Sequence, residues 1–84
     1  MTIFEKDQII FSQSDNPHEH FYIIYQGSVR LYRFVDNEKH ILDICDEGDL
    51  FGLRPLIMNE NYVMGASANE ETILYGIPIA LFHD

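Results

Sequence analysis

Three histidines are the residues of this sequence best suited to metal chemistry. His18 and His20 are separated by one residue, and His40 lies further along the chain. Two histidines at alternate positions of a strand share a face, and neutral imidazole is a common metal ligand. However, Pro17 precedes the pair and indicates a surface turn. The pattern leaves two interpretations open, a metal site and a solvated loop.

Cys45 and two pairs of adjacent acids are the other groups that could take part in catalysis. Cys45 has no neighbouring histidine or lysine to activate its thiol, and a single cysteine cannot supply the four thiolates of an iron–sulfur cluster. Asp46–Glu47 and Glu70–Glu71 lie on predicted turns, where acids are usually solvated. No serine elbow, phosphate-binding loop or dinucleotide fingerprint is present. The sequence therefore predicts no catalytic residue, no cofactor and no enzymatic activity.

Length and composition predict one globular domain over residues 1–84. The chain is 46% hydrophobic and 13% aromatic, which excludes disorder, and no apolar run approaches the ~18 residues of a membrane span. Five Lys and Arg residues against 14 Asp and Glu give a net charge of −9, which opposes direct contact with nucleic acid or an anionic membrane. One cysteine and the absence of a signal peptide favour the cytoplasm.

Turn residues recur about every ten positions, a spacing typical of the short strands of a sandwich or barrel. Between the turns are runs rich in β-branched and aromatic residues, at Ile9–Phe11, Phe21–Tyr25, Ser28–Val35, His40–Ile44, Tyr62–Ala68 and Thr72–Ile77. Asp36–Asn37 predicts a hairpin loop, since both residues tolerate left-handed backbone. Only Gly52–Met58, with Pro55 in its first turn, indicates a helix. We therefore expect an all-β, antiparallel fold with one short helical turn.

The order of these runs resembles the cyclic nucleotide-binding domain of Crp/Fnr-type transcription regulators. Five stretches carry the resemblance, in order and over nearly the whole chain: Ile9–Asp15, Phe21–Tyr32, Gly48–Gly52, Ala66–Ala68 and Thr72–Pro78. The resemblance implies a double-stranded β-helix, the jelly-roll or cupin-like β-roll, with a sensory or regulatory function. In that family a dimerisation helix and a DNA-binding module follow the roll, and we expect neither in this chain.

The resemblance also implies a binding site with altered chemistry. Nucleotide-binding members carry Phe-Gly-Glu, a short helix, and an Arg followed by small residues; the helix N-terminus and the Arg hold the cyclic phosphate, and the Glu holds the ribose. Phe51–Gly52 fits, but Leu53 takes the Glu position and Tyr62 the Arg position. The expected ligand-binding residues of this degenerate cassette are Gly52, Leu53, Arg54, Tyr62, Val63 and Met64. We expect them to bind neither cAMP nor cGMP, and the effector is left unidentified.

Two other functions stay open beside a sensory domain. A small cupin-like metal-dependent protein would use His18 and His20, although no carboxylate follows them at the spacing a cupin's first motif requires. A ligand-free protein-interaction module would need no site at all. Whatever the function, we expect a homodimer, because Ile77–Phe82 is a dense apolar run without an obvious intrachain cover.

Overall fold

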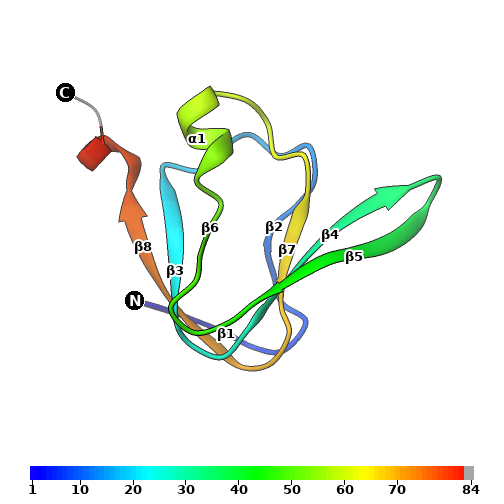
Figure 1. Ribbon diagram of the computed structural model, residues 1–84, viewed down its shortest axis with the longest axis horizontal. Helices are drawn as coiled ribbons and strands as arrows, with labels where there is room; N and C mark the ends of the chain where they lie inside the picture. Colours follow the sequence, from blue (N-terminus) through cyan, green and yellow to red (C-terminus); the bar gives the residue numbers. More distant parts are fainter. Residues whose placement is uncertain (83–84) are drawn as a thin grey trace.

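The chain folds into two four-stranded antiparallel sheets that enclose one core (Figure 1). The computed structural model describes residues 1–82, apart from the side chain of Phe82. The strand order is β1-β8-β3-β6 in the first sheet and β2-β7-β4-β5 in the second. The elements are β1 (Thr2–Phe4), β2 (Ile9–Phe11), β3 (His20–Gln26), β4 (Val29–Val35), β5 (Glu38–Cys45), β6 (Leu50–Phe51), α1 (Arg54–Met58), β7 (Gly65–Ala68), β8 (Thr72–Pro78) and a 3-10 turn at Ile79–Phe82. The predicted all-β roll with one short helix is confirmed.

The structure differs from the sequence prediction mainly at short elements. β1 and β6, of three and two residues, are not among the predicted strands, and they form because they pair with longer strands, β8 and β3. The strand predicted over Tyr62–Ala68 begins only at Gly65. The helix begins at Arg54 rather than at Gly52, since Gly52 has a positive φ of 78° that no helix accommodates.

The two sheets meet in an apolar core that both supply. Phe21, Ile24 and Leu74 from the first sheet and Val29 from the second are among the largest fully buried side chains. Ile77 and Ile79 pack against this core, whereas Leu81 is 73% exposed. The apolar C-terminal run is thus divided between the interior and the surface, and the side chain of Phe82 lies outside the described part.

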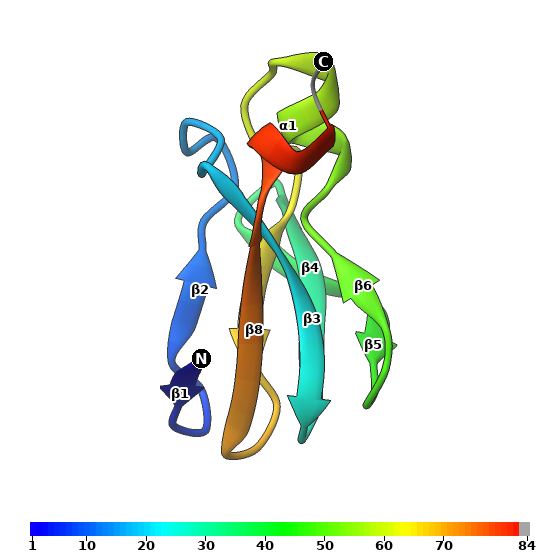
Figure 2. The same cartoon turned by 90° about the vertical axis from the view of Figure 1, so that its left-hand side faces the viewer.

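The β4–β5 hairpin extends beyond the rest of the second sheet (Figure 1). Its turn residues, Asp36 and Asn37, have φ values of 52° and 67°, the left-handed conformation that the sequence predicted for this loop. Figure 2 shows α1 and the 3-10 turn together at one end of the roll, with the β3–β4 and β7–β8 turns at the other. Within residues 1–82, no helix is long and apolar enough to cross a membrane.

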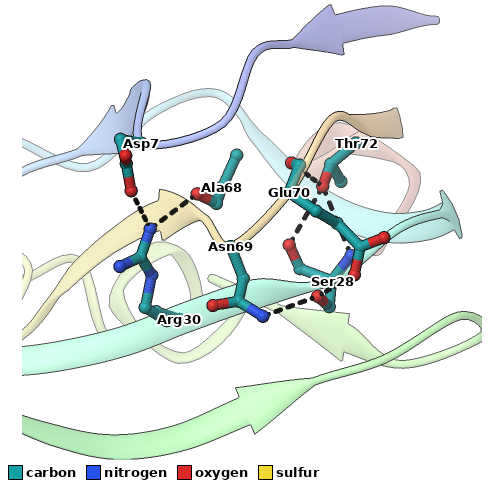
Figure 3. Close-up of polar contacts among 7 residues, drawn as sticks. All are labelled: Asp7, Ser28, Arg30, Ala68, Asn69, Glu70 and Thr72. Atoms are coloured by element: carbon teal, nitrogen blue, oxygen red, sulfur yellow. Dashed lines mark hydrogen bonds and ion pairs between the residues drawn. The ribbon is translucent and has the colours of Figure 1, made fainter.

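A buried hydroxyl joins the two turns at that second end of the roll (Figure 3). Thr72 is fully buried, and its Oγ1 accepts a hydrogen bond from the Ser28 backbone N–H at 3.3 Å. Gly27 approaches so closely that a Cβ there would lie 2.6 Å from Thr72 Oγ1, and its φ is 97°. Thr72 therefore fixes how the β3–β4 turn rests on the start of β8.

Candidate functional site

One pocket lies where β6 and α1 meet the second sheet, and we call it the central pocket. It has a volume of about 260 Å³ and is lined by Phe11, Leu31, Asp43, Cys45, Leu50, Phe51, Gly52, Arg54, Pro55, Glu60, Tyr62, Val63 and Met64. Five of the six predicted ligand-binding residues are in this set. The sixth, Leu53, does not line the pocket. The fold thus brings most of the predicted residues together, although some precede the short helix α1 in the sequence and others follow it.

Gly52 sets the direction in which α1 leaves β6. Its φ of 78° is strained for any other residue, and a Cβ would lie 3.3 Å from Cε2 of Phe11. Phe51, just before it, is buried and pairs with Tyr22 of β3. The turn is therefore held between the core and the pocket.

The start of α1 offers few groups to an anion. Leu53 is the N-cap residue, makes no side-chain capping bond and packs against the core. Pro55 has no backbone N–H to donate. The N–H groups of Leu56 and Ile57 both donate to the Leu53 carbonyl, at 3.1 and 3.2 Å. The Ile57 bond is the regular bond of an α-helix, so Pro55 and Leu56 are the two first-turn positions without a free donor.

Arg54 is the cation of the central pocket, and it faces solvent. Its side chain is 81% exposed, and its Nε lies 3.9 Å from Oε1 of Glu60. Asp43 adds a second carboxylate to the lining. With one cation against two acids, the charged part of the lining is net negative.

Tyr62 contributes to the pocket but belongs to the core. Its ring stacks on Phe11 with centroids 3.8 Å apart, and it is only 2% exposed. Its hydroxyl accepts the backbone N–H of His18 at 3.1 Å. Burial raises the pKa of the Tyr62 phenol above its ordinary value of 10.0. The residue expected at the position of a phosphate-binding arginine is thus a packing residue.

Several lining residues escaped the sequence prediction because they lie on other strands. Phe11, Leu31, Asp43 and Cys45 come from β2, β4 and β5, far from the cassette in sequence. Burial, and then the charges of Asp43 and other nearby acids, raise the pKa of the Cys45 thiol. Leu31 is two residues after the fully buried Val29 on β4 and packs against the core, but no sequence signal links it to residues 52–64.

The three candidate histidines, His18, His20 and His40, do not converge. His18 Nδ1 is hydrogen-bonded to the Tyr22 hydroxyl at 2.8 Å, whereas His20 is exposed at the start of β3. His40 lies on β5, 3.7 Å from Glu38. No group of three His, Cys, Asp or Glu side chains in residues 1–82 is arranged to hold a metal ion. The cupin-like metal site therefore has no support from the described residues.

Comparison with known proteins identifies the fold and the family. The family model of the cyclic nucleotide-binding domain matches residues 1–84, and no curated protein sequence matches the chain. The cAMP-bound form of the EAL enzyme Bd1971 is 38% identical, with a TM-score of 0.87 over 92% of this chain and 21% of that chain. The catabolite activator protein of Thermus thermophilus is 26% identical, with a TM-score of 0.88 over 96% of this chain and 38% of that chain.

A third structure shows the fold alone. The N-terminal domain of a transcriptional regulator from Streptomyces coelicolor A3(2) is 18% identical, with a TM-score of 0.84 over 94% of this chain and 56% of that chain. The chain spans about a fifth of the length of Bd1971. The resemblance that the sequence showed to the sensor β-roll of Crp/Fnr-type regulators is confirmed, and the chain belongs to the cyclic nucleotide-binding domain family.

Proposed function

We propose that this chain is a sensory or regulatory domain whose central pocket takes a small, uncharged and largely apolar effector instead of cAMP or cGMP. The observation that carries the proposal is the direction of Arg54. It faces solvent and Glu60, so the pocket holds no cation directed at a phosphate. The function is regulatory and non-catalytic.

The phosphate of a cyclic nucleotide carries a negative charge that the pocket must compensate. Here the two acids Asp43 and Glu60 outnumber the one cation, Arg54. At the start of α1, Pro55 has no N–H to donate, and the Leu56 N–H is already bonded to the Leu53 carbonyl. A buried anion without a charged or hydrogen-bonding partner is costly. The chain's net charge of −9 adds a repulsive field over the whole surface.

Leu53 and Tyr62 determine how much affinity for a cyclic nucleotide is lost. If they occupy the Glu and Arg positions of a binding cassette, two charge-assisted hydrogen bonds are missing, each worth about 1.5–3 kcal/mol. Because about 1.4 kcal/mol corresponds to tenfold, the affinity falls by roughly two to four orders of magnitude. A site of about 1 µM affinity would then bind at about 0.1–10 mM, and the negative pocket lining and net charge favour the part of that range above about 1 mM.

The shape of the pocket favours a small neutral ligand. Its lining is dominated by apolar side chains such as Leu31, Val63 and Met64, and its volume of about 260 Å³ suits a ligand smaller than a drug-sized molecule. Transfer of apolar surface from water supplies the affinity. The polar edge of the pocket, with Asp43 and Glu60, accepts hydrogen bonds from the ligand.

A second candidate function is retained cyclic-nucleotide binding. It is favoured by the relative Bd1971, 38% identical to this chain, whose structures include a cAMP-bound and a cGMP-bound form. The two candidates differ in one measurable quantity, the affinity for a charged nucleotide.

Isothermal titration calorimetry with cAMP and cGMP tests the proposal, and we expect both dissociation constants to exceed about 1 mM. Val63→Arg places a cation in the pocket lining at a half-exposed side chain, and we expect at least a tenfold gain in cAMP affinity. Met58→Arg adds the same charge on exposed helix surface and serves as the matched control. Micromolar binding of either nucleotide to the unaltered chain would overturn the proposal in favour of the second candidate.

Methyl NMR tests the neutral effector separately, with indole as the probe. The chain has three methionines, of which Met64 lines the pocket while Met1 and Met58 are exposed. Indole should shift the Met64 methyl signal and leave the other two in place. Equal shifts of all three signals, or none, would contradict an apolar ligand site.

A further inference from the structure

The outer face of the second sheet is unusually apolar for an exposed surface. Strand register places Tyr32 and Phe34 of β4, with Ile41 and Ile44 of β5, on this side of the sheet, away from the core. Phe34 is 50% exposed, Ile41 50% and Ile44 40%, and Ile9 of β2 adds a fourth side chain at 56%. Exposed apolar patches on soluble proteins commonly mark interaction sites.

A groove of about 430 Å³ crosses this face, and we call it the outer groove. It is lined by Asp7, Ile9, Ser12, Gln13, Tyr32, Phe34, Lys39 and Ser67. Its floor contains Tyr32, which is buried although it lies outside the core: a Cβ on Gly65 would come within 2.6 Å of the ring. Ser67 is 3% exposed, and its Oγ has no hydrogen-bond partner within the described residues.

Charge sets this face apart from the rest of the molecule. The groove lining contains one acid, Asp7, and one lysine, Lys39, and Arg30 of the same face pairs with Asp7, so these three side chains carry a net charge of +1. A second copy of a protein with net charge −9 is repelled by most of the surface. The outer face is a region where a second copy can approach without that repulsion.

The outer groove is lined by one charged side chain of each sign, Lys39 and Asp7. Lys39 Nζ lies 4.2 Å from the centroid of the Tyr32 ring and has no ion-pair partner among residues 1–82. Asp7 gives one carboxylate oxygen to Arg30, and its side chain is still 65% exposed, so the other oxygen is accessible to a second cation. A two-fold axis that reverses the groove brings each Lys39 to the opposite Asp7.

We propose that two copies of this chain form a symmetric dimer through the outer face, with Lys39 of each copy against Asp7 of the other and Phe34 against Ile9. The face, and not the neighbouring strand edge, forms the contact. β5 is an edge strand, but it carries a register shift opposite Leu31/Tyr32 and the charge of Lys39, and both features oppose edge-to-edge pairing.

The area of the face limits the strength of this dimer. Four strands spaced by about 4.8 Å, with seven residues of about 3.3 Å each, give a footprint of at most about 440 Å². Stable interfaces bury about 800 Å² on each partner, so this contact belongs to the weak class. We expect a dissociation constant of about 10–300 µM.

Sedimentation equilibrium of the whole chain, from about 10 µM to about 1 mM, measures this constant. The mass should rise with concentration from 9.8 kDa toward twice that value. Phe34→Asp should raise the dissociation constant at least tenfold, and Lys39→Glu several-fold. Arg33→Glu makes the same charge change at an exposed position of β4 that faces the opposite side of the sheet from Phe34, outside the groove, and should have little effect.

A second control separates this surface from the C-terminal run. Leu81→Asp alters the exposed end of that run and should leave the dimer intact. Concentration-dependent amide shifts at Ile9, Phe34 and Lys39 of the unaltered chain report the contact without any variant. A monomer up to about 1 mM, or a dimer lost in Leu81→Asp and kept in Phe34→Asp, would overturn the proposal.

Discussion

Replacing Thr72 with valine removes one hydroxyl from the polar cluster that joins the β3–β4 and β7–β8 turns, with little change in side-chain volume (Figure 3). The Thr72 side chain is fully buried, and its Oγ1 accepts from the Ser28 N–H at 3.3 Å. The same oxygen lies 2.9 Å from the Ser28 carbonyl and 2.7 Å from that of Glu70, and its proton is donated to one of them. Valine can make none of these bonds.

The loss of stability in Thr72→Val follows from the Ser28 N–H, which is left without its acceptor. A lost hydrogen bond is worth about 1 kcal/mol, and a buried N–H left without an acceptor costs about 1–3 kcal/mol. Ser28 is 3% exposed, so water does not readily replace the hydroxyl, whereas its carbonyl keeps the Asn69 N–H at 2.9 Å. We therefore expect Thr72→Val to lower the free energy of unfolding by about 2–3 kcal/mol. For a domain of this size that corresponds to a fall of about 10–20 °C in Tm.

Urea unfolding followed by circular dichroism measures the loss, with two matched variants. Thr72→Ser keeps the hydroxyl and loses one methyl group, so it should cost about 1 kcal/mol. Thr2→Val makes the same substitution as Thr72→Val at an exposed strand position and should change the stability by less than about 0.5 kcal/mol. The reasoning fails if Thr72→Val unfolds at the wild-type urea concentration, or if Thr72→Ser is the less stable of the two Thr72 variants.

Three further predictions concern a glycine, a carboxylate and a thiol. Gly65→Ala places a methyl group 2.6 Å from the Tyr32 ring, so thermal unfolding should show a loss of about 1–3 kcal/mol; unchanged stability would mean that the ring moves freely. The hydrogen bond and charge of Arg30 hold the pKa of Asp7 below its ordinary value of 3.8. The ionised pair therefore stabilises the fold above pH 3.8, and this contribution is lost as the pH falls through the lowered pKa. NMR titration should show a higher Asp7 midpoint in Arg30→Gln, and an unchanged midpoint would refute the assignment. Burial raises the pKa of the Cys45 thiol. Iodoacetamide should therefore alkylate the native chain at pH 8 at least about tenfold more slowly than the urea-unfolded chain. Equal alkylation rates would show that the thiol is accessible in the native fold.

The structure also changes how the binding cassette should be engineered. From the sequence, Leu53→Glu combined with Tyr62→Arg is the natural way to restore a phosphate site. In the fold, Leu53 packs against the core and Tyr62 stacks on Phe11, so both substitutions place charge where apolar packing holds the roll together. Val63 is the better position, because it lines the pocket and its side chain is half exposed.

The class of fold and the order of the main strands can be predicted from local sequence patterns. Short-range patterns suffice for this prediction: the β-branched and aromatic runs at Ser28–Val35 and His40–Ile44, and the Asp36–Asn37 turn between them, whose left-handed backbone these two residues favour. The resemblance to the cyclic nucleotide-binding domain rests likewise on short sequence stretches and on their order along the chain. The family could therefore be recognised before any coordinates.

Where the candidate residues lie in the fold depends on tertiary packing. Tyr62 and Leu53 look like ligand-facing positions in the sequence, but packing against Phe11 and the core directs them inward. Asp43 and Cys45 join the central pocket because β5 pairs with β4, a contact set by sheet register and not by any neighbouring residue. A pocket is made by side chains from separate strands, so its charge and shape depend on long-range packing that local sequence patterns do not encode.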